Sequence, residues 1–140
     1  MTVSETRTVV IEREMNHSID KIWRALTDSH LVAEWLMKND FQPVVGRPFT
    51  LNSDPMPQWD GVIACKVTAV EPKTRLAYSW ATMGVELMVN VTLTPTGGGV
   101  LVRIEQSGFA ADNDAAFNGA TYGWRRFIAR LDEVAGGLSQ

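Results

Sequence analysis

The chain has 140 residues, of which 45% are hydrophobic, and its 13 Lys and Arg against 16 Asp and Glu give a net charge of −3. This length and hydrophobic content predict one globular domain over 1–140 with a sizeable core. The acidic balance, without any run of basic residues, argues against a nucleic-acid partner, because phosphate binding relies on a basic face. No segment approaches the roughly 20 apolar residues of a membrane span, so none is expected.

The single cysteine, Cys65, cannot form an internal disulfide. The first ten residues also lack the apolar core of a signal peptide, so we expect a cytoplasmic protein. Cys65 stands in a predicted strand without a second cysteine nearby, which indicates a buried and inert thiol. The sequence contains no metal-binding, phosphate-loop or nucleophile motif, and we therefore predict no metal, no cofactor and no catalytic residue.

The first elements are predicted to be one strand and two short helices. Residues 7–15 alternate and are rich in β-branched side chains, which is typical of a strand. Residues 18–28 follow a helical apolar pattern, with Ser18 as the N-cap. A second short helix is expected over 30–37, capped by Asp28 or by the serine that follows it.

A run of about six strands follows these helices. We expect them at 40–44, 47–52, 62–70, 75–81, 85–94 and 100–107. Short connections make consecutive strands antiparallel neighbours. Alternation in the last two strands places apolar side chains on one face, which another layer must cover. The proline-rich segment 53–61 is interpreted as a loop at a cavity entrance.

The last helix carries aromatic side chains and an interior glycine. It is expected to begin after Asn113 or Asp114 and to run to about Gly137, with charged residues such as Asp132 facing water. Gly123 lies inside it, at a cost of about 1 kcal/mol relative to alanine. Two interpretations are open: the glycine lets the helix backbone approach the sheet, or it leaves room beside the neighbouring tryptophan. Only this helix is long enough to cover the sheet, which gives an α+β plan.

The order of these elements and several stretches of sequence resemble a known superfamily. The stretches are IEREMNHSIDKIWRALTDSHLVAEWL (11–36), VVGRPFTL (44–51), VTAVEPKTRLAYSW (67–80), VNVTLTPTGGGVLVRIEQSGF (89–109) and GWRRFIARLDEV (123–134). They are similar to the START-like helix-grip (SRPBCC) superfamily, and within it to the branch named after the activator of heat-shock protein 90 ATPase. The resemblance implies a single helix-grip domain, in which a curved antiparallel sheet of about six to seven strands wraps around a long C-terminal helix, with two short helices after the first strand. It also implies a cavity between the sheet and the long helix that accepts apolar ligands.

Aromatic and aliphatic residues on the inner faces are the candidate lining of that cavity. They are Trp35, Phe41, Phe49, Trp59, Tyr78, Trp80, Val89, Val91, Val102, Ile104, Phe117, Trp124, Phe127 and Ile128. Each residue has two interpretations, a pocket wall or a filled core. As a set, stiff rings around a curved sheet favour a cavity, because they pack imperfectly.

Two polar residues are candidates for orienting a ligand. Arg13 has the parity of the inward residues of its strand, where it would meet Glu34 or an acidic group of a ligand. The alternative is an exposed Arg13 at the sheet edge. Gln106 shares a face with Ile104 and could donate to a ligand carbonyl, whereas Asn90 is expected to point outward.

The sequence therefore favours a protein that binds a small hydrophobic molecule, lipid-like or aromatic, between the sheet and the last helix. A cyclase-like or aromatase-like enzyme is one alternative, and a chaperone-interacting stress-response protein is another. The enzyme would need several inward polar groups, and the two histidines, His17 and His30, lack a neighbouring nucleophile. A homodimer through an exposed strand edge is a further possibility.

Overall fold

The structure is a computed structural model that describes residues 6–54, 57 and 59–138. Within these residues the strands are β1 (Thr6–Met15), β2 (Lys38–Asn39), β3 (Pro48–Asn52), β4 (Val62–Glu71), β5 (Arg75–Thr82), β6 (Val85–Pro95) and β7 (Val100–Ala110). The helices are α1 (Ile19–Thr27), α2 (Ser29–Trp35) and α3 (Asp114–Gly136). The two short helices follow β1, and α3 ends the described chain.

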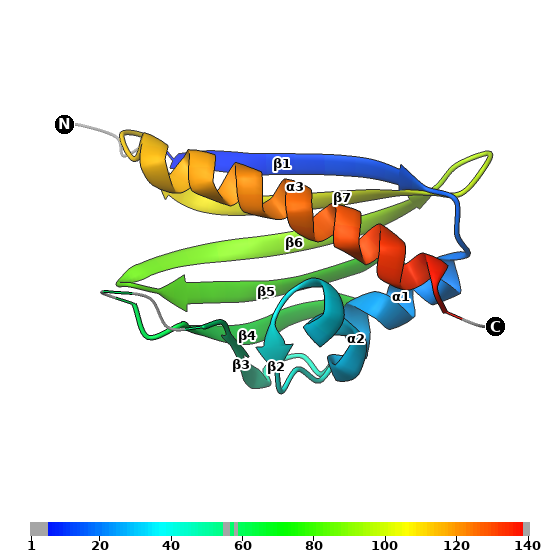
Figure 1. The fold of residues 1–140 in the computed structure, drawn as a ribbon, viewed down its shortest axis with the longest axis horizontal. Helices are drawn as coiled ribbons and strands as arrows, with labels where there is room; N and C mark the ends of the chain where they lie inside the picture. Colours follow the sequence, from blue (N-terminus) through cyan, green and yellow to red (C-terminus); the bar gives the residue numbers. More distant parts are fainter. Residues whose placement is uncertain (1–5, 55–56, 58, 139–140) are drawn as a thin grey trace.

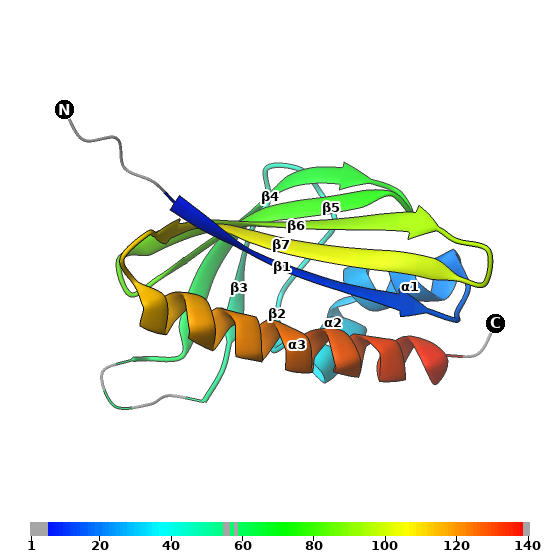
Figure 2. The same ribbon diagram turned by 90° about the horizontal axis from the view of Figure 1, so that it is seen from above.

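All described strands belong to one antiparallel sheet with the order β1-β7-β6-β5-β4-β3-β2. The first strand therefore lies beside the last, and the other neighbours are consecutive in the chain. Figure 1 shows α3 crossing one face of this sheet, and Figure 2 shows the sheet curving above the helices. This arrangement confirms the predicted α+β helix-grip fold.

The predicted helix caps are present. The Ser18 hydroxyl accepts from the Lys21 backbone N–H at 3.3 Å, and the Asp28 carboxylate accepts from the His30 N–H at 2.9 Å. At the start of α3 the Asn113 side chain accepts from the backbone N–H of the third following residue at 3.1 Å. Each cap satisfies a donor that has no partner inside its own helix, which is why these helices begin where the sequence indicates.

The strand predicted at 40–44 is wrong. The strand in this region is β2, which ends at Asn39. The Asn39 side-chain oxygen accepts the Phe41 backbone N–H at 3.0 Å, and an Asp40 carboxylate oxygen accepts the Thr50 N–H at 2.7 Å. These side chains take up backbone donors that a longer strand would pair in the sheet, so the chain turns instead.

Strand β7 is longer than predicted because it contains a β-bulge at Gly108. The pair Thr8–Ser107 is followed by the pair of Arg7 with Phe109, so Gly108 has no partner of its own in β1. Its φ of 105° lies in the range that favours glycine. The extra residue shifts the alternation of β7, and Phe109 is consequently buried on the inner face.

The pairing of Asp132 contradicts the expectation that the polar side of α3 only faces water. The Arg13 Nε donates to Asp132 Oδ2 at 2.7 Å, and the His17 Nε2 donates to Oδ1 at 2.6 Å. Arg13 thus lies at the sheet edge with its side chain 46% exposed, and its partner is on α3 rather than Glu34. The carboxylate joins β1 and the segment before α1 to the C-terminal half of the long helix.

Replacing Asp132 with asparagine should destabilise the fold by about 1–2 kcal/mol near neutral pH. Burial favours a higher pKa for Asp132, but the hydrogen bonds and charges of Arg13 and His17 lower it below the ordinary value of 3.8. A lowered folded pKa adds stability above the unfolded value of 3.8, and this stability is lost as the pH falls through the folded pKa. Urea unfolding from about pH 7 to about pH 2.5 should therefore show the two proteins converging below about pH 4. A constant gap at all pH values, or an equal effect of Asp112→Asn at an exposed position, would contradict this.

Cys65 should be unreactive in the folded protein. Burial raises the pKa of its thiol to about 12, with a smaller contribution from the charge of Asp40. The thiolate is the reactive form, so Ellman's reagent at about pH 8 should label the native chain only through unfolding. Labelling should become fast and stoichiometric in denaturing urea; rapid labelling without urea would contradict the buried position on β4.

Candidate functional site

A cleft of about 550 Å³ lies between the N-terminal half of α3 and the adjacent ends of β5, β6 and β7. Its sheet side is lined by Trp80, Thr82, Met83, Gly84, Val85, Glu86, Leu87, Gln106, Gly108, Phe109 and Ala110. Its helix side is formed by Asn113, Ala116, Gly119, Ala120, Gly123, Trp124 and Phe127. In Figure 1 this is the end of the sheet farther from α1 and α2.

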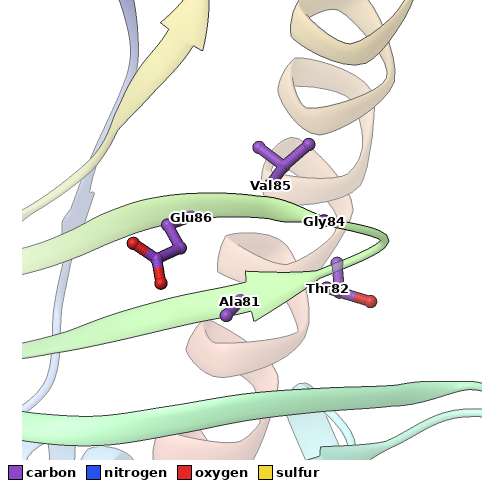
Figure 3. Close-up of a pocket in the computed structure, with 5 residues that line it drawn as sticks. All are labelled: Ala81, Thr82, Gly84, Val85 and Glu86. Carbon is purple, nitrogen blue, oxygen red and sulfur yellow. The ribbon is translucent and has the colours of Figure 1, made fainter.

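The β5–β6 turn forms one rim of the cleft. Figure 3 shows this turn with α3 behind it. The five residues labelled in the figure also line a shallow hollow of about 560 Å³. Met83 and Gly84 have φ values of 52° and 76°, which are the positive angles of a two-residue hairpin turn. The turn leaves Met83 69% exposed, so a flexible apolar side chain stands at the mouth of the cleft.

Small residues form the helix side. Ala116, Gly119, Ala120 and Gly123 follow an i, i+3, i+4, i+7 pattern, so they share one face of α3. A Cβ added at Gly119 would meet nothing within 4 Å, and one at Gly123 would meet only the Phe127 ring, at 3.8 Å. The interpretation that Gly123 lets the helix backbone approach the sheet is therefore wrong. The glycines leave space, as the other interpretation expects.

Aromatic rings and one amide lie next to this space. The Trp124 ring centroid is 5.7 Å from that of Trp80 and 5.6 Å from that of Phe127. The Trp124 indole N–H donates to Gln106 Oε1 at 2.7 Å, and both side chains are buried. Among the described residues of the cleft, the single titratable side chain is that of Glu86. The site therefore offers apolar contact and hydrogen bonding.

Trp80, Gln106, Trp124 and Phe127 are the sequence-predicted residues that the structure brings together in the cleft. Sequence reasoning missed Leu87, Phe109 and most of the small helix residues. The spacing of alanine and glycine between 116 and 123 was a signal for the helix side. The alternation of β7 could not predict that Phe109 points inward, because its direction depends on the bulge before it.

A second group of predicted residues packs together elsewhere. Phe41 and Phe49 are 5.0 Å apart, and Phe49 and Tyr78 are 5.2 Å apart, measured between ring centroids. With Trp35 and Val91 they surround a space of only about 10 Å³, which is about the size of one water molecule. Burial raises the pKa of the Tyr78 hydroxyl. These residues fill the core under α1 and α2.

The other predicted residues lie around the cleft or beneath the helix. Val89, Val102, Ile104 and Ile128 are buried in the core between sheet and helix.

Phe117 packs edge-on against Phe109, with the Arg7 guanidinium 3.8 Å above its ring. The Trp59 indole N–H donates to the Thr82 hydroxyl at 2.8 Å, which ties it to the rim. Residues 55, 56 and 58 of the predicted entrance loop lie outside the described residues.

The described residues contain no group of His, Cys, Asp and Glu that could hold a metal ion. His17 contacts Asp132, His30 is the second residue of α2, and neither lines the cleft. None of the helices in residues 6–54, 57 and 59–138 is long and apolar enough to span a membrane.

Comparison with known proteins supports both the fold and the family resemblance of the sequence. The family model described as Activator of Hsp90 ATPase homolog 1-like protein matches residues 16–136. Protein MLL2253 from Mesorhizobium loti is 44% identical, with a TM-score of 0.88 over 96% of this chain and 100% of that chain. Protein BH1534 from Bacillus halodurans is 26% identical, with a TM-score of 0.80 over 95% and 99% of the two chains.

CalU16 from Micromonospora echinospora shares the fold at 21% identity, with a TM-score of 0.78 over 95% of this chain and 78% of that chain. No curated protein matches the sequence. The family match covers most of the chain, and the likeness to MLL2253 extends over nearly all of it. The chain therefore belongs to the family of Activator of Hsp90 ATPase homolog 1-like proteins.

Proposed function

We propose that the protein binds a small, mainly apolar molecule in the cleft between α3 and the β5–β6 end of the sheet. The observation that carries the proposal is a space of about 550 Å³ bordered by Trp80, Phe109, Trp124 and Phe127. Ligand pockets commonly enclose about 300–1,000 Å³ and are lined by apolar side chains with a few polar groups. The volume and the chemistry of this cleft support a ligand of that kind.

The small residues of α3 support the same proposal. Gly119 and Gly123 each carry a helix penalty of about 1 kcal/mol relative to alanine. No described neighbour outside the helix requires the absence of a side chain at these positions, because added Cβ atoms would fit. A ligand that occupies the space provides a reason to leave it open. Each 100 Å² of apolar surface that it buries contributes about 2.5 kcal/mol before the loss of translational and rotational freedom.

The chemistry of the lining favours binding over catalysis. A general acid–base reaction requires a positioned proton donor and acceptor at the reacting atoms. In the described part of the cleft Glu86 is the one titratable group, and it lies beside the exposed β5–β6 turn. Ring faces and an amide can hold and orient a molecule, which is the role we propose.

Filling the cleft should weaken binding strongly without unfolding the protein. Gly119→Leu places a branched side chain where a Cβ meets nothing within 4 Å, and Gly119→Ala adds only a methyl group at the same position. Both changes should raise the free energy of unfolding by up to about 1 kcal/mol, because glycine is the poorer helix former. The leucine variant should bind the neutral fluorescent probe N-phenyl-1-naphthylamine at least about 10-fold more weakly than wild type, whereas the alanine variant should stay within about 3-fold.

Fluorescence titration measures these affinities, and native mass spectrometry of freshly purified protein tests for a molecule already bound. Loss of a co-purified molecule in Gly119→Leu would support the proposal independently of the probe. Equal probe binding by wild type and the leucine variant would place the site elsewhere. No probe binding together with no co-purified molecule would count against the function itself.

A further inference from the structure

The hydrogen bond between Trp124 and Gln106 fixes the orientation of a buried amide. An indole N–H can only donate, so the Gln106 atom at 2.7 Å from Trp124 Nε1 must be the carbonyl oxygen Oε1. The amide NH₂ group of Gln106 consequently faces away from Trp124. Gln106 is paired with Val9 on β1 and Val89 on β6, so both flanking positions in the sheet are apolar.

The NH₂ group of Gln106 is a donor without an acceptor in the described part of the chain. The side chain is only 2% exposed, and it lines the cleft. Among the described residues the fully enclosed side-chain atom without a partner is Thr96 Oγ1, so the Gln106 nitrogen reaches the open cleft, where a ligand oxygen would replace water as its acceptor. Trp80 also lines the cleft, and its indole N–H likewise has no acceptor among the described residues.

The charges around the cleft disfavour an anionic ligand. The described lining contains the carboxylate of Glu86 and no basic side chain. Arg126 and Arg130 line a separate hollow of about 200 Å³ toward α2. A carboxylate or phosphate buried beside Trp124 would therefore lose its hydration without gaining a counter-charge.

We infer that the ligand is a neutral apolar molecule with an oxygen acceptor, such as a ketone or quinone carbonyl, which accepts from the Gln106 amide. This inference rests on the proposed function and narrows the class of ligand. It separates a neutral carbonyl compound from a fatty acid, both of which satisfy the apolar lining. Gln106 is the residue that sets this preference, and the rings around it provide most of the contact area.

Three naphthalenes of similar shape test the inference: 2-acetylnaphthalene, its alkene analogue 2-isopropenylnaphthalene, and the anion 2-naphthoate. Calorimetric titration of wild-type protein should show the ketone binding about 3- to 10-fold more tightly than the alkene, as expected for one hydrogen bond. The naphthoate should bind most weakly. In ¹H–¹⁵N spectra the side-chain NH₂ signals of Gln106 should shift with the ketone and much less with the alkene.

Substitutions test whether Gln106 is the residue that causes the preference for the ketone over the alkene. In Gln106→Met the ratio of ketone to alkene affinity should fall to about 1, whereas the same change at exposed Gln42 should leave the ratio unaltered. Gln106→Met also removes the acceptor for Trp124, so Gln106→Glu provides a variant that keeps an acceptor there. At about pH 8 the glutamate variant should lose the ketone preference as well.

Equal affinities of wild type for the ketone and the alkene would overturn the inference, and so would a preference for naphthoate. Persistence of the ketone preference in both Gln106 variants, or no binding of any of the three compounds, would also overturn it. These results are separate from the test of the proposed function, because N-phenyl-1-naphthylamine carries no oxygen acceptor. If that probe binds and Gly119→Leu blocks it while the ketone has no advantage, the binding site stands and the ligand class is wrong.

Discussion

The shape of the site depends on how α3 is held against the sheet. Its buried residues are Trp124, Ile128, Leu131 and Ala135, so all of them except Trp124, which is close to the middle, lie in the second half of the helix. The same half carries Asp132, which contacts Arg13 and His17. The first half is anchored only at its start, where Arg7 of β1 donates to Asp114 at 2.6 Å and Phe117 packs against Phe109, and the residues that follow on the face toward the sheet are small. Between these two sets of contacts the small side chains of α3 do not reach the sheet, and the cleft lies there.

Two local features of the sheet, a β-bulge and a tight turn, shape this opening. The bulge at Gly108 extends β7 and turns Phe109 inward, where a regular strand would have pointed it out. The two-residue turn at Met83 and Gly84 ends β5 and β6 at the same level. Together they give the uncovered end of the sheet an apolar wall and a rim. The cleft is consequently a product of strand length and register as much as of the helix.

The alternation of side chains was enough to predict much of the fold. Period-two patterns assigned Val89 and Val102 to the buried face, and polar caps such as Ser18 and Asn113 marked where helices begin. These features are local, because they depend on the pleat of a strand or on the unpaired donors of one helix turn. The strand wrongly predicted at 40–44 shows the limit of such patterns, because side-chain oxygens of Asn39 and Asp40 accept backbone N–H groups that a longer strand would pair in the sheet.

Sorting core residues from cleft residues could not be done from the sequence. Tyr78 and Trp80 are two positions apart on β5 and point to the same face, yet Tyr78 lies in the packed core and Trp80 lines the cleft. Their difference comes from what lies opposite: Phe41 and Phe49 in one case, and the small residues of α3 in the other. That information is tertiary. The ion pair between Arg13 and Asp132 is also a tertiary contact, because the two residues are 119 positions apart in the sequence.

The Trp124–Gln106 hydrogen bond lies where the packed core meets the cleft. Trp124 is the first buried residue along α3, and Gln106 is the last inward residue of β7 before the bulge. A polar pair in an apolar layer has few alternative geometries, because separating it leaves two buried groups without partners. The bond therefore fixes the spacing between helix and sheet at the point where close packing ends. The same amide then presents its remaining donors on the side where the described residues provide no acceptor, so the contact that closes the core also gives the cleft its polarity.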